Sequence, residues 1–175
     1  DASKESLRRF DEAYFARYPY LLGYFPRAAV EGRRLLEIGL GFGTLGERLA
    51  RLGADYHGLD LAAAPVAMLH SRLARVPGAR PDQVAQGSAL ELPFEDASFD
   101  HVVSIGCLHH TGDLFGSVAE CRRVLRPGGR LVLMVYNRRS WKVLWMVLKY
   151  GKGDFRKTKR LIAERSEAQF GSPVT

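Results

Sequence analysis

The sequence has few cysteines and no long apolar run. Its two cysteines, Cys107 and Cys121, form no CxxC pair and are too few for a disulfide framework, which predicts a protein of a reducing, cytoplasmic compartment. The longest strictly apolar run is VLWMVL, at residues 143–148, and the N-terminal stretch DASKESLRRFDEAYF is charged. A membrane-spanning helix needs about 20 apolar residues, so the sequence predicts neither a spanning segment nor a secretion signal.

Most of the chain also lacks an excess of charge of one sign. Residues 1–137 contain 16 Lys and Arg and 16 Asp and Glu, whereas residues 138–175 contain 10 and 3, so the whole net charge of +7 lies in the last segment. A uniformly basic body that binds nucleic acid is therefore not expected, although a basic arm stays open. At 175 residues and 46% hydrophobic content, one domain is expected. Because the chain begins at Asp1 without methionine and stops at Thr175, we expect it to be a piece of a longer protein.

Apolar runs and helical patterns alternate along the chain. The expected strands are 35–38, 56–59, 82–86, 101–105 and 130–136, and the expected helices between them are 44–52, 65–75 and 114–125. This alternation predicts a parallel sheet with helices on both faces, that is, a doubly wound, Rossmann-like, three-layer α/β/α sandwich. Two segments lie outside it: a helical pattern at 4–30, broken at Pro19, and an apolar-aromatic helix followed by a basic one at 140–168.

The stretch LLEIGLGFGTLGERLA, residues 35–50, places Gly39, Gly41 and Gly43 at alternate positions directly after the first expected strand. In a parallel sheet the ligand crevice lies beyond the carboxyl ends of the strands. A bend without side chains lets a ligand touch the backbone beside the free N–H groups of the next helix. These glycines therefore predict a nucleotide-type site, and a tight turn without a ligand is the alternative.

A dinucleotide fingerprint would need glycine at position 44, which is Thr44. An acid, Glu37, then one residue and the alternate glycines resemble instead the first motif of the class I S-adenosylmethionine-dependent methyltransferases. The stretches YHGLDLA, QGSALELPFEDASFDHVVSIGCLHHTGD and VLRPGGRLVLMVY resemble later strand regions of that family in the same order. The resemblance covers residues 33–137 and is closest to methyltransferase domains of type 11 or 25 that act on small molecules.

The resemblance implies that S-adenosyl-L-methionine binds at this edge of the sheet. Asp60 ends the second expected strand, where its carboxylate can accept hydrogen bonds from two ribose hydroxyls; its alternative role is to cap the helix ahead of Pro65. Ser88 stands where many relatives have an aspartate that accepts from the adenine amino group, and a neutral hydroxyl binds that group more weakly. The implied cofactor residues are Glu37, Gly39, Leu40, Gly41, Gly43, Asp60, Leu61, Ser88, Ala89, Leu90, Gly106 and Tyr14.

The family also uses residues before the first strand as a lid. Tyr14, Tyr18 and Tyr20 can approach the carboxylate of the cofactor or place a ring face near its sulfonium, or they can be ordinary packing residues. The implied organisation is one methyltransferase domain over residues 1–175. It consists of an N-terminal helical lid (1–32), a cofactor-binding core (33–137) and a basic helical tail (138–175).

Two adjacent histidines, His109 and His110, follow the fourth expected strand in SIGCLHHTGD. Histidine titrates near neutral pH, which suits a general base that removes a proton from a phenol or an alcohol. The alternative is that they bond to the backbone while Thr111 or Asp113 caps the next helix. The pair has no cysteine or carboxylate at helical spacing beside it, so no metal site is predicted.

In the tail, Trp141, Leu144, Trp145 and Leu148 share one helical face, which needs an apolar partner. A complete fold of this family continues with two antiparallel strands, and nothing after residue 137 reads as those strands. The sheet is therefore expected to lack them and to expose an edge through which two copies can pair. The tail can line a hydrophobic acceptor pocket, lie on an anionic membrane surface through residues 141–160, or contact nucleic acid.

These features predict an S-adenosylmethionine-dependent methyltransferase whose acceptor is a small hydrophobic, phenolic or quinone-like molecule, with nucleic acid as the less favoured partner. Two other hypotheses stay open. One is an RNA methyltransferase that uses the basic tail. The other is a non-catalytic domain that keeps the cofactor fold as a scaffold.

Overall fold

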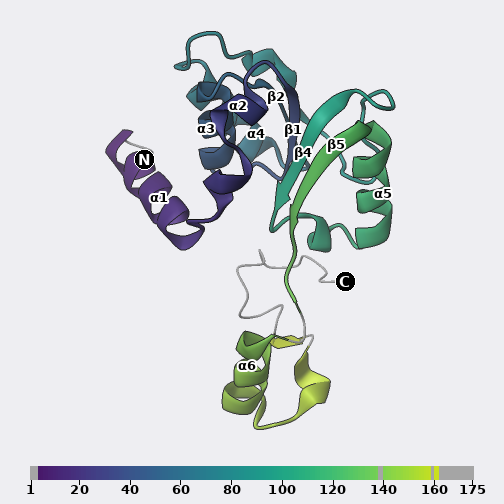
Figure 1. Ribbon diagram of the computed structural model, residues 1–175. Coiled ribbons are helices and arrows are strands. Elements are labelled where there is room, and N and C mark those ends of the chain that lie inside the picture. The colour runs from purple at the N-terminus through teal and green to yellow at the C-terminus, as the bar shows by residue number, and fades with distance from the viewer. Residues whose placement is uncertain (1–3, 138–139, 159, 162–175) are drawn as a thin grey trace.

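The computed structural model describes residues 4–137, 140–158 and 160–161 (Figure 1). Its centre is a five-stranded sheet in the order β3-β2-β1-β4-β5. The strands are β1 (Arg34–Ile38), β2 (Asp55–Asp60), β3 (Val84–Gln86), β4 (Phe99–Ile105) and β5 (Leu125–Met134). Every neighbouring pair is parallel, which confirms the predicted doubly wound sheet. Because β1 lies between β2 and β4, the strand order reverses beside it and leaves a crevice beyond its carboxyl end.

Helices and short turns connect and flank the strands. The α-helices are α1 (Lys4–Arg17), α2 (Arg27–Val30), α3 (Thr44–Arg51), α4 (Ala63–Leu73), α5 (Leu114–Val124) and α6 (Trp141–Gly151). The 3-10 turns are η1 (Leu21–Tyr24), η2 (Pro81–Gln83), η3 (Leu108–His110) and η4 (Phe155–Lys157). Local sequence explains where helices begin: Asp113 caps α5 by accepting from Gly116 N at 2.9 Å, and Ser140 caps α6 by accepting from Val143 N at 3.3 Å.

The sheet is buried on both faces. Leu35 and Leu36 are adjacent in β1, so their side chains point to opposite faces, and both are fully buried. Leu35 joins a core cluster with Leu49 of α3 and Leu69 of α4, whereas Leu36 joins a second cluster with Val124 of α5. Figure 1 shows α3 and α4 on one side of the sheet and α5 on the other. Each such leucine contributes about 1.5–3 kcal/mol on burial.

The last strand differs from the sequence expectation. It begins at Leu125, five residues before the expected start at Arg130, and its register with β4 is irregular between Phe99 and His101. The sequence Pro127-Gly128-Gly129 reads as a turn, but here it lies within an edge strand, where proline and irregular pairing are tolerated. Among the described strands, only β4 pairs with β5. Whether this edge stays open and pairs with a second copy is a prediction.

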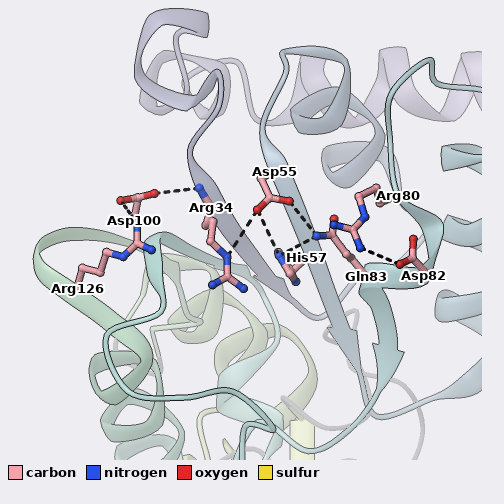
Figure 2. A network of polar contacts seen from close by, with 8 residues as sticks. All are labelled: Arg34, Asp55, His57, Arg80, Asp82, Gln83, Asp100 and Arg126. Atoms are coloured by element: carbon pink, nitrogen blue, oxygen red, sulfur yellow. Dashed lines mark hydrogen bonds and ion pairs between the residues drawn. The ribbon is translucent and has the colours of Figure 1, made fainter.

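Charged side chains gather at the amino ends of the strands (Figure 2). Asp55 at the start of β2 lies 3.6 Å from Arg34 Nε and accepts from Gln83 Nε2 at 2.9 Å. Asp100 accepts from Arg34 N at 2.9 Å and from Arg126 Nη1 at 2.8 Å. Both carboxylates thus have partners from neighbouring segments, Asp55 from side chains and Asp100 from a backbone N–H and a side chain. This edge of the sheet is closed by the chain itself.

After β5 the chain leaves the sheet, and Figure 1 shows α6 and η4 standing apart from it. The predicted aromatic helix is present as α6, whereas most of the predicted basic helix lies outside the described residues. None of the helices in the described ranges has the length and apolar character that crossing a membrane requires.

Candidate functional site

The glycine bend, residues 39–43, joins β1 to α3. Gly39, Gly41 and Gly43 have φ values of +85°, +52° and +76°, a region that glycine enters at little cost. A Cβ atom on Gly39 would overlap with the side chain of Cys107, which follows β4. Gly39 is therefore required by the close approach between the bend and the end of β4, in addition to its backbone angle.

Gly41 has different surroundings, because a Cβ atom placed there meets no other atom within 4 Å. Leu40 before it is buried in the core, and Phe42 after it is 54% exposed. The turn is closed by Gly43 N, which donates to Leu40 O at 2.8 Å. Gly41 thus leaves open backbone surface at the centre of the bend, which is what close contact with a ligand needs.

Asp60 links the end of β2 to this bend. Its Oδ2 accepts from Leu40 N at 2.8 Å and its Oδ1 accepts from Ala62 N at 2.9 Å. The N-cap residue of α4 is Ala62, and no side chain caps that helix, so Asp60 does not have the alternative role of helix cap. A carboxylate has about four acceptor positions, and these two bonds leave further positions for ligand hydroxyls.

Glu37 lies beneath the bend and is only 4% exposed. Its Oε2 accepts from the Tyr56 hydroxyl at 2.6 Å. Burial raises the pKa of Glu37 to about 8, the Tyr56 hydrogen bond opposes that shift, and the negative charge of Asp60 adds to it. A Cβ atom on Gly46 of α3 would overlap with the Tyr56 hydroxyl. Glycine inside this helix is therefore explained by the buried Glu37–Tyr56 pair.

Apolar side chains flank the far end of β2 and β3. Leu61 is 73% exposed and Leu90 is 42% exposed, whereas Ala89 is buried. Ser88 Oγ accepts from Leu90 N at 3.1 Å, so this hydroxyl shapes its own turn and keeps a second lone pair. Gly106, directly after β4, has φ of +74° and donates from its N to Met134 O at 2.9 Å.

The two histidines form a ring cluster with Tyr136 at the ends of β4 and β5. The ring centroid of His109 lies 4.0 Å from that of His110 and 4.4 Å from that of Tyr136. His109 is 2% exposed, and burial together with His110 lowers its pKa to about 4. Burial also lowers the pKa of His110, which is partly exposed. Both rings are therefore neutral near pH 7, and His110 is the more accessible base.

A polar contact holds α1 over the start of α3. Asp11 accepts from Thr44 Oγ1 at 2.6 Å and forms two hydrogen bonds of 2.9 Å with the guanidinium of Arg72. The Arg72 side chain is 3% exposed and also donates to Glu47 at 2.7 Å. No residue of α1 is buried. The hydrogen bonds of Asp11 with Thr44 and Arg72 therefore contribute a large part of the attachment of α1 to the rest of the domain.

The aromatic residues of the N-terminal segment reach different places. Phe10 lies 4.5 Å, centroid to centroid, from Phe42 of the glycine bend. Tyr14 packs against Tyr18 at 5.1 Å, and burial, together with the nearby Glu37 charge, raises its pKa. Tyr20 instead lines a cavity of about 540 Å³ along β5. Tyr14 is thus near the bend, whereas Tyr20 lies along the edge strand.

Sequence reasoning missed the partners that hold these residues in place. Tyr56 reads as an ordinary strand residue and Gly46 as a tolerated helix glycine. Asp11 and Arg72 are 61 positions apart, and Tyr136 is far from the histidines in sequence. Their contacts arise only in the folded chain, and a glycine inside a helical pattern was the one available signal.

The arrangement fits S-adenosylmethionine. With the cofactor bound, the open backbone at Gly41 would face its amino-acid moiety and the remaining acceptor positions of Asp60 would face its ribose hydroxyls. The exposed Leu61 and Leu90 would then lie beside its adenine ring. Within the described ranges, no group of three or more His, Cys, Asp or Glu side chains is arranged to hold a metal ion. The roles of individual residues toward the cofactor stay predictions.

A reversed strand order with a glycine bend beyond its central strand and an acid at the end of the next strand is the arrangement in which doubly wound sheets bind nucleotides. The chain belongs to the methyltransferase domain family, whose model matches residues 36–133. S-adenosylmethionine is the cofactor of this family. The parallel sheet and the family match both confirm the resemblance to the methyltransferases.

Relatives named "Ubiquinone biosynthesis O-methyltransferase" are similar to this chain. The protein from Pseudomonas aeruginosa is 34% identical over 142 residues, which is 75% of this chain and 60% of that protein. The protein from Xanthomonas campestris is 39% identical over 114 residues, 64% of this chain and 46% of that protein. A solved S-adenosylmethionine-dependent methyltransferase from Mesorhizobium loti is 27% identical with a TM-score of 0.55, covering 66% of this chain and 51% of that chain. The chain spans about half of these proteins.

Proposed function

We propose that the protein transfers the methyl group of S-adenosylmethionine to a hydroxyl oxygen of a small phenolic or quinone-like molecule. One observation carries the proposal: the glycine bend touches the segment that bears the histidines. Gly39 lies against Cys107, and His109 and His110 follow directly in η3. The predicted cofactor surface and a pair of neutral imidazoles thus meet at one edge of the sheet.

The names of the O-methyltransferase relatives support an oxygen acceptor. When bound, the cofactor supplies an activated methyl group, so the protein mainly has to align the acceptor and exclude water. A phenol must lose its proton as its oxygen bonds to the methyl carbon. His110 would receive that proton, because its imidazole is neutral and partly exposed. His109, with a pKa of about 4, would hold the ring of His110 in place.

A methyl-transfer assay with radiolabelled cofactor tests the proposal against its alternatives. We expect label in a catechol or a hydroquinone, and none in transfer RNA. His110→Gln should lower kcat at least tenfold and remove the acidic limb of the pH profile. His70→Gln is the matched control and should retain activity, because His70 of α4 bonds through Nε2 to Val84 O of β3 at 2.9 Å and is outside the cluster of His109, His110 and Tyr136.

Other results would favour the other hypotheses. Label in RNA alone would favour the RNA methyltransferase, for which the basic tail is the supporting feature. Cofactor binding without transfer to any acceptor would favour a non-catalytic scaffold. Equal loss in the His110 and His70 variants would contradict the proposed base.

A further inference from the structure

The outer face of α6 is apolar and exposed. Trp141 is 83% exposed, Trp145 is 53% exposed and Leu148 is 57% exposed. Their spacing places them on one side of the helix. The opposite side is packed, because Met146 and Val147 are buried. The inner side of the helix is therefore packed, whereas its outer face is contacted only in part, by Lys149 and Tyr150 beside Trp145, among the described residues.

Positive charge surrounds this outer face. Lys149 Nζ lies 4.4 Å from the ring centroid of Trp145 and 5.3 Å from that of Tyr150, and Lys152 follows the helix. Asp154, the one acid between residues 140 and 161, lies 3.5 Å from Lys157 Nζ and also caps η4. Its charge is therefore largely compensated, and the surface is cationic.

The composition of this surface fits a lipid interface. Tryptophan prefers the boundary between water and hydrocarbon, and lysine can extend its charge toward headgroups while its methylenes stay near apolar groups. Phe155 of η4, 62% exposed, adds a further aromatic group beside the helix. Leu148 on the same face suits acyl chains, whereas a nucleic acid offers it no apolar counterpart. Figure 1 shows α6 and η4 clear of the sheet, so they can approach a plane.

We propose that α6 and η4 dock on an anionic lipid surface, with Trp141, Trp145 and Leu148 inserted at the headgroup boundary and the lysines paired with lipid charges. Amphipathic helices with aromatic and aliphatic residues on one face and basic residues around it bind membranes in this way. Docking goes beyond methyl transfer and does not depend on the acceptor, because it uses residues outside the candidate site.

Tryptophan fluorescence tests the docking directly. Trp141 and Trp145 are the two tryptophans of the whole sequence, so the emission of the unmodified chain reports on α6. Vesicles of equimolar phosphatidylglycerol and phosphatidylcholine should shift the emission to the blue, and brominated lipid should quench it. Vesicles of phosphatidylcholine alone should bind at least tenfold more weakly, and added salt should weaken binding to the anionic vesicles.

Matched variants localise the effect. Trp145→Ser should weaken vesicle partitioning about tenfold, because it removes a large apolar contact. Phe115→Ser, which removes an 86% exposed aromatic residue on α5, should leave partitioning unchanged. Both variants should keep the parent's circular dichroism. Trp145→Ser should also keep methyl transfer to a soluble catechol, so a failed docking test and a failed activity test can be told apart.

Four outcomes would overturn the proposal. The first is that the tryptophan emission stays unchanged with anionic vesicles, and the second is that it shifts equally with vesicles of phosphatidylcholine alone. The third is that transfer RNA quenches the emission at concentrations at which vesicles have no effect, which would assign the surface to nucleic acid. The fourth is that the emission is already blue-shifted without vesicles, which would mean that another part of the protein covers the face.

Discussion

The two ends of β2 carry the same residue type in opposite surroundings. Asp55, at the amino end, meets Arg34, Gln83 and, at 3.7 Å, His57 Nε2 (Figure 2). Asp60, at the carboxyl end, accepts from two backbone N–H groups in the described structure and lies beside open surface at the glycine bend. One edge of the sheet is closed by pairs of side chains, whereas the other holds acceptors and apolar groups that a ligand can use.

This difference separates the residues that stabilise the fold from those that bind. Groups that already have protein partners contribute to stability, and removing one leaves the other buried and unpaired. Groups that retain free hydrogen-bonding positions contribute little to folding until a ligand occupies them. Substitutions at the two edges should therefore affect different measurements, and four of them are given below in order of expected size.

The largest effect is expected at Gly39. Its φ of +85° is matched by Gly112, but a Cβ atom on Gly39 would overlap with Cys107, whereas one on Gly112 meets nothing within 4 Å. Gly39→Ala should lower the free energy of unfolding by about 3 kcal/mol or more, because backbone strain and overlap add. Gly112→Ala should lower it by about 1–2 kcal/mol through strain alone. Urea unfolding measures the free energy lost in each variant. Equal losses would show that the close approach to Cys107 adds nothing to the cost of the substitution.

The second comparison uses the two ends of β2. Asp60→Asn should weaken binding of S-adenosylmethionine by about 10- to 100-fold, because a charged acceptor of ribose hydroxyls becomes neutral. Asp55→Asn should leave that affinity unchanged and lower the thermal midpoint, since its partners lie at the amino edge. Isothermal calorimetry measures the cofactor affinity of the two variants, and thermal unfolding measures their midpoints. Equal losses of affinity would mean that binding follows global stability.

The third effect concerns pH and Glu37. Because the folded chain raises the pKa of this carboxyl from 4.5 to about 8, it retains a proton that the unfolded chain has released. The free energy of unfolding should therefore fall as pH rises across that interval. Glu37→Gln should remove most of this decline between about pH 5 and about pH 8. Glu91→Gln, at an exposed glutamate, serves as the control and should keep the parent's profile.

Most strands and the glycine bend could be predicted from the sequence because both depend on local signals. Short apolar runs ended by glycine or an acid predict the strands, and Gly39 to Gly43 predict the bend that the structure contains. Thr111 and Asp113 were named as alternatives for the cap of the next helix, and Asp113 is that cap. The start of β5 was wrong because Pro127 and the glycines after it are turn residues in isolation, and only pairing with β4 extends the strand over them.

The partners of the site could not be predicted, because they depend on contacts between distant segments. Burial of Glu37 against Tyr56 requires the β1–β2 register together with the glycine in α3. Asp11 reaches Arg72 only after α1 has folded back over α3 and α4. The reduced basicity of His109 follows from its burial and from the neighbouring His110, and its ring packs on Tyr136, which is distant in sequence. A pattern that predicts an element carries no information on which side chains that element meets.

The smallest effect is expected at Ser88, on the binding edge. We predict that its hydroxyl accepts a hydrogen bond from the adenine amino group, where a neutral acceptor contributes about 1 kcal/mol. Ser88→Ala should then weaken S-adenosylmethionine binding about fivefold. Because Ser88 Oγ also accepts from Leu90 N at 3.1 Å, the loss of that turn must be measured separately. Inosine-based cofactor, which lacks the amino group, supplies the control: it should bind the parent and Ser88→Ala equally. If the alanine variant binds the natural cofactor as tightly as the parent does, the adenine contact is absent and the serine serves the turn alone.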